Sequence, residues 1–251
     1  MNILVINDDG MDAPGIGALT LALSQAADVY VCAPDTQQSA RSHGITIRGT
    51  VTVTPHSLPG AKRAWRVTGT PADCTKLGLE LCADFGISVD MVYSGINMGS
   101  NLGADTLYSG TVGAAMEAAI DGIPAVSVSV DSHQATIFES ACHLAVSVMD
   151  LARELPAGTI LNVNAPHCPL AEMRGVRVTT LGGRYYDDLF TPDGNGVYTL
   201  NGKVPPDSTY HPDWDITAIQ EGYGSLTPMA ADRTAVGSMD LVQQWTNKRD
   251  L

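Results

Sequence analysis

The sequence predicts an α/β fold in which a Rossmann-like, mostly parallel sheet lies between two layers of helices. Through the first 163 residues, short apolar segments of strand character alternate with segments whose apolar residues recur at helical spacing. This alternation is typical of a three-layer sheet that binds ligands at the carboxyl ends of its strands. Beyond about residue 166, short extended pieces rich in proline and glycine predict a β-rich extension. We therefore expect a core at residues 1–165 and, within the same domain, an extension at 166–251.

The individual elements follow from local signals along the chain. Strands are expected at residues 2–7, 28–33, 45–54, 64–68, 91–94, 125–130 and 159–163, the third and fourth of them paired as a hairpin. Helices are expected at residues 16–26, 71–81, 112–121 and 137–154. Thr70 suits the N-cap of the second helix and Pro71 its first position. In the extension, "VRVTTLGGRYY" and "GVYTL" have the pattern of hairpin strands, and "DITAIQEGYGSLTPM" is expected to form short extended pieces.

Composition narrows the class of protein. With 44% hydrophobic and 16% charged residues, the chain of 251 residues is globular, and it contains no apolar run long enough to span a bilayer. No basic stretch precedes the first apolar segment, so we expect a cytoplasmic protein without a signal peptide. The net charge of −13 argues against binding to duplex nucleic acid. The five cysteines include no CxxC pair, which favours reduced, buried thiols over disulfides or zinc.

Two adjacent acids follow the first expected strand, in "ILVINDDGMDAPG". In a continuing strand, the side chains of Asp8 and Asp9 would point to opposite faces. Both can reach one cation only if the chain leaves the strand, which Gly10 permits. Two close carboxylates repel each other, and a hard divalent cation removes that repulsion. On this motif alone, a turn or capping pair before the next helix remains the alternative.

Two further motifs follow the next strands. The polar loop "PDTQQSARSHG" carries Ser39, Ser42 and His43 after the second strand, where a long polar loop suits a binding site. The glycine-rich "SGINMGSNLG" follows the strand at 91–94 and offers the amide groups of Asn97 and Asn101. Taken singly, the first is equally an ordinary connection and the second a structural turn.

A fourth motif, "YSGTVGAAMEAA", places Ser109, Gly110 and Thr111 directly before a helix. Backbone amides and hydroxyls at a helix N-terminus bind anions, although a simple Ser/Thr cap would have the same sequence. All four motifs lie at the carboxyl ends of strands, where they can converge. Acids with neutral oxygen ligands indicate a Mg²⁺ or Mn²⁺ site, and the helix N-terminus indicates a seat for phosphate. Together they favour metal-assisted phosphoryl chemistry.

Two rival functions share parts of these patterns. A dinucleotide-dependent oxidoreductase fits the fold class, but the GxGxxG fingerprint is absent, as is the GxxxxGK[ST] of a nucleotide triphosphatase. A non-catalytic nucleotide- or metal-binding module would keep the same loops and acids and release no phosphate. This second rival stays open at this point.

Six segments in the same order along nearly the whole chain resemble the SurE family of survival-protein 5′/3′-nucleotidases. They are "NDDGMDAPGIGAL", "APDTQQSARSH", "GTPADC", "SGINMGSNLG", "YSGTVGAAMEA" and "GYGSLTP". The resemblance implies a phosphatase that acts on nucleoside 5′-monophosphates, in some members also on 3′-monophosphates and short polyphosphate. It also implies one divalent cation, Mg²⁺ or Mn²⁺, in each subunit. A C-terminal segment exchanged between subunits, giving homodimers or homotetramers, is implied as well.

The resemblance assigns roles by position. The implied metal ligands are Asp8, Asp9, Ser39 and Asn97, and Ser109, Gly110 and Thr111 match the anion-holding turn of the family. From the loop motifs, Asn101 and His43 are further candidates for binding phosphate or substrate. Asp8 and Asp9 are expected to be catalytic. Of these two, Asp8 is expected to orient or deprotonate the attacking water, since the DxDx[TV] pattern of covalent aspartate phosphatases is absent. His43 is expected to protonate the leaving alkoxide.

Three features depart from the family pattern, one of them the C-terminal "GYGSLTPM", a looser version of the usual "GYVSITPL". Met98 stands where members often have a basic residue, and Gly44 replaces a hydroxyl residue often found after the histidine. Neither position is one of the four implied metal ligands.

Overall fold

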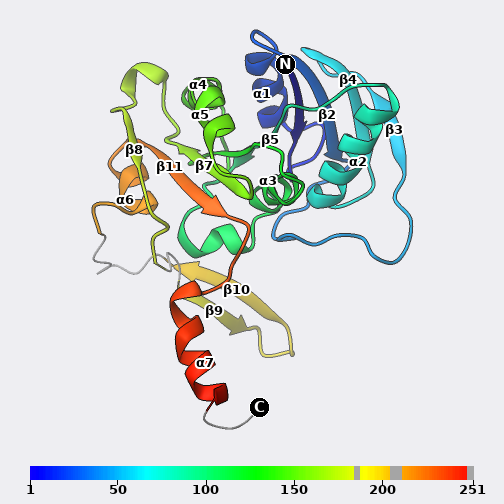
Figure 1. Cartoon of the computed structure of the whole chain (residues 1–251). Helices are drawn as coiled ribbons and strands as arrows, with labels where there is room; N and C mark the ends of the chain where they lie inside the picture. The colour runs from blue at the N-terminus through cyan, green and yellow to red at the C-terminus, as the bar shows by residue number, and fades with distance from the viewer. Residues whose placement is uncertain (184–186, 204–210, 248–251) are drawn as a thin grey trace.

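The computed structural model describes residues 1–183, 187–203 and 211–247, and its centre is a mixed sheet covered by helices on both faces (Figure 1). The strand order is β3-β4-β2-β1-β5-β6-β7-β11-β8, and neighbours from β4 to β7 are parallel. Their bounds are β1 Asn2–Ile6, β2 Asp28–Pro34, β3 Val53–His56, β4 Ala61–Val67, β5 Met91–Met98, β6 Ala125–Val130, β7 Thr159–Ala165, β8 Val176–Val178 and β11 Gly224–Ala230. The predicted fold class is confirmed.

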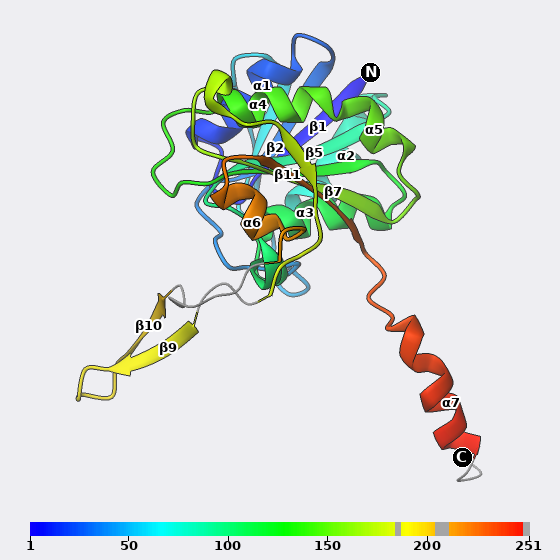
Figure 2. The same ribbon diagram turned by 90° about the vertical axis from the view of Figure 1, so that its left-hand side faces the viewer.

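Helices form the two outer layers. One face of the sheet carries α1 (Pro14–Leu23), α4 (Glu139–Ser147) and α5 (Met149–Glu154), and the other carries α2 (Pro71–Asp84) and α3 (Gly110–Ile120), as Figure 2 shows. Each face has its own apolar core, because successive strand residues point to opposite sides. The sheet is therefore buried on both faces, as parallel sheets require.

The order of the strands places a switch point beside β1. The chain runs from β1 outward through β2 to β4, then returns to β5 on the other side of β1 and continues to β6 and β7. At such a point the loops after two neighbouring strands turn in opposite directions and leave a crevice, in which open α/β sheets bind their ligands. The loops after β1 and β5 are those that carry the paired acids and the glycine-rich motif.

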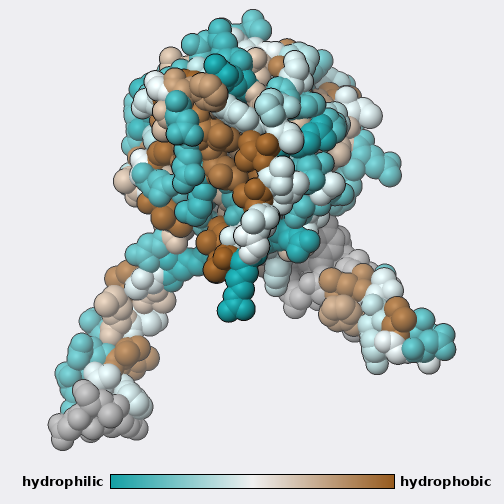
Figure 3. Space-filling model, turned by 90° about the vertical axis from the view of Figure 1, so that its right-hand side faces the viewer, coloured by the Kyte–Doolittle hydropathy of each residue, from teal (hydrophilic) through white to brown (hydrophobic). Residues whose placement is uncertain are grey.

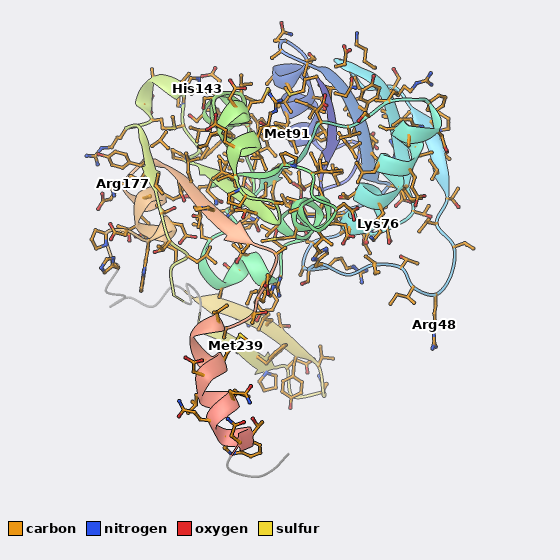
Figure 4. The ribbon with its side chains drawn as sticks, in the orientation of Figure 1. Arg48, Lys76, Met91, His143, Arg177 and Met239 are labelled. Atoms are coloured by element: carbon orange, nitrogen blue, oxygen red, sulfur yellow. The ribbon has the colours of Figure 1, made fainter. Side chains whose placement is uncertain are left out.

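Several boundaries differ from the prediction. Residues 45–52 form an exposed loop, and the hairpin begins only at β3, which pairs antiparallel with β4. The alternation there has no buried face: Ile45 and Ile47 are 44% and 83% exposed, and Arg48 points away from the body (Figure 4). The helix expected at 137–154 is broken at Val148 into α4 and α5. β5 continues four residues beyond the predicted end, into the first half of the glycine-rich motif.

The C-terminal extension contributes both to the sheet and to two projecting arms. β8 and β11 join the main sheet, and α6 (Asp215–Gln220) is a helix where extended pieces were expected. One arm is the hairpin of β9 (Asp187–Pro192) and β10 (Tyr198–Lys203), and the other is α7 (Met239–Asn247) (Figure 2). The end of "VRVTTLGGRYY", at 184–186, lies outside the described residues. The division at residue 165 stays a prediction.

Short 3₁₀ turns complete the fold. They are η1 (Gly103–Leu107), η2 (Leu170–Glu172) and η3 (Val236–Ser238). All five cysteines are free thiols, three of them buried. Over the ranges 1–183, 187–203 and 211–247, no helix has the length and apolar character needed to cross a membrane.

Candidate active site

The turn after β1 presents two carboxylates at the switch point. β1 ends at Ile6, and the side chain of Asn7 then closes a tight turn: its amide donates to the Gly10 carbonyl (2.8 Å) and its oxygen accepts the Gly10 amide (3.2 Å). Gly10 has a φ of +100°, which glycine adopts readily. The chain therefore leaves the strand before the acids, as the sequence predicts.

Asp8 lies buried against the N-terminus of α3. Its side chain accepts a hydrogen bond from the Thr111 hydroxyl, and the residue is 4% exposed. Burial raises the pKa of Asp8 from 3.8 to about 6, the Thr111 hydroxyl lowers it in part, and the charge of Asp9 raises it further. A Cβ on Gly110 would lie 2.9 Å from the Asp8 Cβ, so glycine lets the helix end approach this carboxylate.

Asp9 bridges the switch point. Its Oδ2 accepts the Met98 backbone amide of β5 at 3.0 Å, which joins the turn after β1 to the end of the neighbouring strand. Burial raises the pKa of Asp9, and the Met98 amide lowers it in part. Two adjacent carboxylates, both with a raised pKa, are thus held side by side. A divalent cation bound to them would favour the ionised form of each.

Asn97 and Ser39 come from the neighbouring strand ends. The Asn97 side-chain nitrogen donates to the Gly99 carbonyl (2.7 Å), which leaves the amide oxygen uncommitted by that bond. Ser39 is exposed and follows Gln38, whose backbone amide donates to the Asp8 carbonyl (2.7 Å). The segments carrying all four implied ligands are therefore tied together, by the Gln38–Asp8 backbone bond and by the bond from the Met98 amide to the Asp9 side chain.

The donor set fits a hard divalent cation. Within the described ranges, no group of three or more His, Cys, Asp or Glu side chains is placed to hold a metal ion. Two carboxylates with neutral amide and hydroxyl oxygens are instead the ligands that Mg²⁺ and Mn²⁺ prefer over thiolate and imidazole sites. The residues present fit the cation that the sequence predicts.

The N-terminus of α3 contacts the carboxylate of Asp8 directly, through Thr111. Ser109 caps the helix by accepting the Val112 amide (3.1 Å), and the backbone of Thr111, like its hydroxyl, lowers the pKa of Asp8. The predicted phosphate seat at residues 109–111 is therefore adjacent to the acids. The anion that this helix end already stabilises is an aspartate of the same site.

His43 lies against Glu117, about two turns further along α3 than the helix end that contacts Asp8. Its Nε2 is 2.6 Å from an oxygen of Glu117, which also pairs with Lys76 of α2 at 2.5 Å. Burial raises the pKa of Glu117, but the contacts with Lys76 and His43 lower it by more, so that the pKa lies below its ordinary value. Ser42 adds two hydrogen bonds to the carbonyls of Leu107 and Tyr108, so the loop that carries Ser39 is fastened to the start of α3. The sequence analysis missed Glu117, a single acid in an Ala/Gly-rich helix.

Asn101 is part of a buried polar network. Its side chain donates to Ser129 of β6 (2.8 Å), and its backbone amide donates to the Asn164 side chain of β7 (2.8 Å). Its carbonyl accepts from Asn162 and Asn164. In the structure these contacts anchor the glycine-rich loop to the sheet.

Replacing Asn164 with alanine is expected to lower the free energy of unfolding by about 2–3 kcal/mol, because it removes two buried hydrogen bonds and leaves the Asn101 amide unpaired. Urea denaturation measures this change as a lower midpoint at constant slope. Asn201→Ala, an exposed asparagine of β10, is the matched control and is expected to shift stability by less than about 0.5 kcal/mol. Equal shifts in the two variants would contradict an anchoring role for the network.

Polar residues after β6 also face this site and were missed. Asp131, Ser132 and His133 follow directly on the fully buried strand Ala125–Val130, and the charge of His133 lowers the pKa of Asp9. The sequence signal that could have identified these residues was their position at the carboxyl end of a strand, immediately after an apolar run.

Comparisons with known proteins identify the family of this chain. The family model described as Survival protein SurE matches residues 3–188. The 5′-nucleotidase SurE of Synechococcus sp. (strain JA-3-3Ab) is 39% identical over 255 residues, which cover 98% of this chain and 97% of that protein. The 5′/3′-nucleotidase SurE of Proteus mirabilis (strain HI4320) is 40% identical over 257 residues, with coverage of 100% and 98%.

A solved structure is similar over the same length. The crystal structure of the SurE protein from Aquifex aeolicus matches with a TM-score of 0.84 at 33% identity, covering 98% of this chain and 99% of that one. The fold, the order of the motifs and the relatives therefore lead to one assignment: this chain belongs to the SurE family.

Proposed function

We propose that this chain is a metal-dependent nucleotidase, which hydrolyses nucleoside 5′-monophosphates to nucleosides and inorganic phosphate. The observation that carries the proposal is the pair Asp8 and Asp9 at the switch point of the sheet, held between the end of β5 and the N-terminus of α3. Its relatives bear the names 5′-nucleotidase SurE and 5′/3′-nucleotidase SurE. Activity on 3′-monophosphates and on short polyphosphate is part of the proposal.

We assign the residues of the site to three roles: binding the metal ion, binding the phosphate and activating the water. Asp8, Asp9, Ser39 and Asn97 would hold one Mg²⁺ or Mn²⁺ ion per subunit. When bound, the cation supplies positive charge at the phosphoryl oxygens as the ester bond breaks. The proposed phosphate seat is formed by Ser109, Gly110 and Thr111 at the helix N-terminus. Asp8, fixed by Thr111, orients or deprotonates the attacking water.

The leaving alkoxide needs a proton, and the group that donates it must lie near the substrate. His43 remains the proposed donor, and Asn101 a proposed substrate contact. In the structure both side chains already have protein partners, Glu117 and Ser129 respectively. A variant that keeps the loop in place, His43→Gln, tests the proton transfer: its kcat for a poor leaving group should fall further than its kcat for p-nitrophenyl phosphate.

A phosphate-release assay separates the nucleotidase from a non-catalytic binding module. The purified protein is expected to release phosphate from nucleoside 5′-monophosphates with Mg²⁺ or Mn²⁺, to lose this activity with a chelator, and to regain it when the metal is restored. A matrix of metals against 5′- and 3′-monophosphates and polyphosphate also reveals the preferred ion. Nucleotide binding without phosphate release under every metal would favour the binding module.

The two projecting arms are the reason to expect that subunits assemble into an oligomer. Hydrophobic side chains lie on both arms (Figure 3), including Phe190 and Leu200 on the hairpin and Leu241 and Val242 on α7, each more than half exposed. A lone hairpin and a nine-residue helix are marginal in water, so these arms need a partner surface. We infer a homodimer or homotetramer in which the C-terminal segment is exchanged between subunits.

Light scattering tests this assembly. The full chain is expected at two or four times the mass of one subunit, and the double variant Leu241→Glu, Val242→Glu is expected to shift toward the monomer. The control is Leu21→Glu on α1, which is also about half exposed. An unchanged mass in the double variant, or a monomeric full chain, would contradict the exchange. The free thiols and the charge of −13 are consistent with a cytoplasmic protein that does not bind duplex nucleic acid.

A further inference from the structure

A cavity of about 280 Å³ lies between the loop after β5 and the loop after β6. The first loop contributes Gly99, Ser100, Leu102 and Asp105 to its walls, and the second contributes Asp131, Ser132 and His133. Its volume is close to the lower end of the range for small-molecule sites, about 300 Å³. None of the roles assigned above uses it.

The cavity lies next to the candidate metal site along β5 and the loop that follows it. Gly99 is two residues beyond Asn97, whose side chain donates to the Gly99 carbonyl at 2.7 Å. The Gly99 amide in turn donates to the Val130 carbonyl (3.0 Å), which joins the two loops at the end of the sheet nearest to Asp9. The cavity therefore adjoins the strand end that carries a candidate metal ligand.

The two loops hold each other in a fixed arrangement. Gly99 has a φ of +111°, and a Cβ there would lie 2.5 Å from the His133 ring, so the imidazole packs directly on a glycine backbone. Ser100 donates a hydrogen bond of 2.5 Å to Asp131 Oδ1, which links the loops a second time. The walls are thus pre-formed.

The chemistry of the walls excludes a phosphate and suits a sugar with a base. Two aspartates repel an anion, whereas a carboxylate offers about four lone-pair positions to hydroxyl donors. An acidic side chain that accepts the ribose hydroxyls is the solution used by dinucleotide-binding α/β folds. His133 is exposed and offers a flat ring to a base, and Leu102, which is 5% exposed, adds a small apolar contact at the wall.

We propose that this cavity is the nucleoside subsite, in which the Asp131–Ser100 pair binds the ribose hydroxyls and His133 with Leu102 contacts the base. This inference rests on the proposed nucleotidase function and deepens it. It makes Asp131 the residue by which the protein selects nucleotides over other phosphate monoesters.

The test compares Asp131→Ala with the wild-type protein on two kinds of substrate. The ratio of kcat/KM for a ribonucleoside 5′-monophosphate to that for p-nitrophenyl phosphate is expected to fall about tenfold, as loss of a hydrogen bond to a charged group predicts. The wild-type preference for the ribonucleotide over its 2′-deoxy analogue is expected to shrink in the variant. Asp121→Asn, an exposed acid at the far end of α3, is the control and keeps the wild-type ratio.

A binding measurement separates this inference from the proposed function. Calorimetry with the four common ribonucleosides, which carry no phosphate, is expected to show binding to the wild type and weaker binding to Asp131→Ala and to His133→Ala. Asp131 and His133 are exposed, and the unfolding midpoints of both variants confirm that they fold. Absence of phosphate release would overturn the nucleotidase proposal alone. Unchanged substrate ratios together with unchanged nucleoside binding would overturn the subsite.

Discussion

Replacing Asp8 with asparagine is expected to abolish phosphate release and, at the same time, to stabilise the metal-free protein. Asp8 is 4% exposed, and its pKa of about 6 in the folded protein compares with an ordinary value of 3.8. Ionising this buried group at neutral pH opposes folding by at most about 3 kcal/mol. Asparagine has nearly the same shape and still accepts the Thr111 hydroxyl, so it removes the charge and keeps the contact.

The pH dependence gives the sign of this effect. Because the folded-state pKa is the higher one, the folded protein binds the extra proton between about pH 4 and pH 6, and stability falls as the pH rises through that window. Thermal unfolding with a chelator should therefore show no advantage of the variant near pH 4 and the full advantage above about pH 6. Added Mn²⁺ is expected to stabilise the wild type and not the variant.

Asp12 provides the matched control in the same segment. It pairs with Arg66 at 2.7 Å, and that contact lowers its pKa, so Asp12→Asn is expected to remove a favourable interaction and to leave phosphate release intact. Near-normal turnover of Asp8→Asn with saturating Mg²⁺ or Mn²⁺ would contradict the assignment of Asp8 as a catalytic residue. Identical pH profiles for Asp8→Asn and the wild type would contradict the buried charge.

Gly15→Ala is expected to destabilise the protein by about 3 kcal/mol and to distort the active site. A Cβ on Gly15 would lie 2.0 Å from the Ile96 carbonyl oxygen and 3.0 Å from its carbon, and a backbone group cannot rotate away as a side chain can. The helix α1 would have to move from β5, or the end of β5 would have to shift. Ile96 precedes Asn97, so either movement reaches a candidate metal ligand.

Gly17→Ala in the same helix is the control for Gly15→Ala. Apart from its chain neighbours and the backbone of its own helix, no atom lies within 4 Å of a Cβ at Gly17, so alanine there should gain about 0.5–1 kcal/mol from the lower entropy of the unfolded chain. Urea unfolding midpoints are expected to move in opposite directions for the two variants. A shift in the same direction would contradict the close approach of α1 to β5.

The parts of the fold that depend on neighbouring residues could be predicted well. The strands from β1 to β7 and the alternating helices follow from the period of the apolar residues, and the class of sheet follows from their order. The start of α2 is an example: Thr70 accepts the Asp73 amide and Asp73 accepts the Thr70 amide, so the cap is encoded within four residues. The hairpin of β3 and β4 was expected, although its first strand begins later than predicted.

The wrong predictions concern segments whose secondary structure depends on contacts with residues distant in sequence. Residues 45–52 alternate like a strand, but Ile45 and Ile47 remain exposed because no apolar surface lies against them. The segment Asp215–Gln220 is helical because Asp215, fully buried, accepts the backbone amides of Gly103, Gly182 and Ile216, two of them distant in sequence. Nothing local to that segment encodes those partners.

The sequence alone determined that two carboxylates follow a buried strand, that a polar loop and a glycine-rich loop follow two others, and that a helix N-terminus stands nearby. These features are local, since they depend on composition, turn residues and apolar period. Only the tertiary structure decided that β5 returns beside β1, so that Met98 donates to Asp9 and Thr111 to Asp8. It also turned His43 toward Glu117 and placed Asn101 in a buried network. Such contacts join residues dozens of positions apart, and packing of the sheet and its helices, rather than local propensity, fixes those distances.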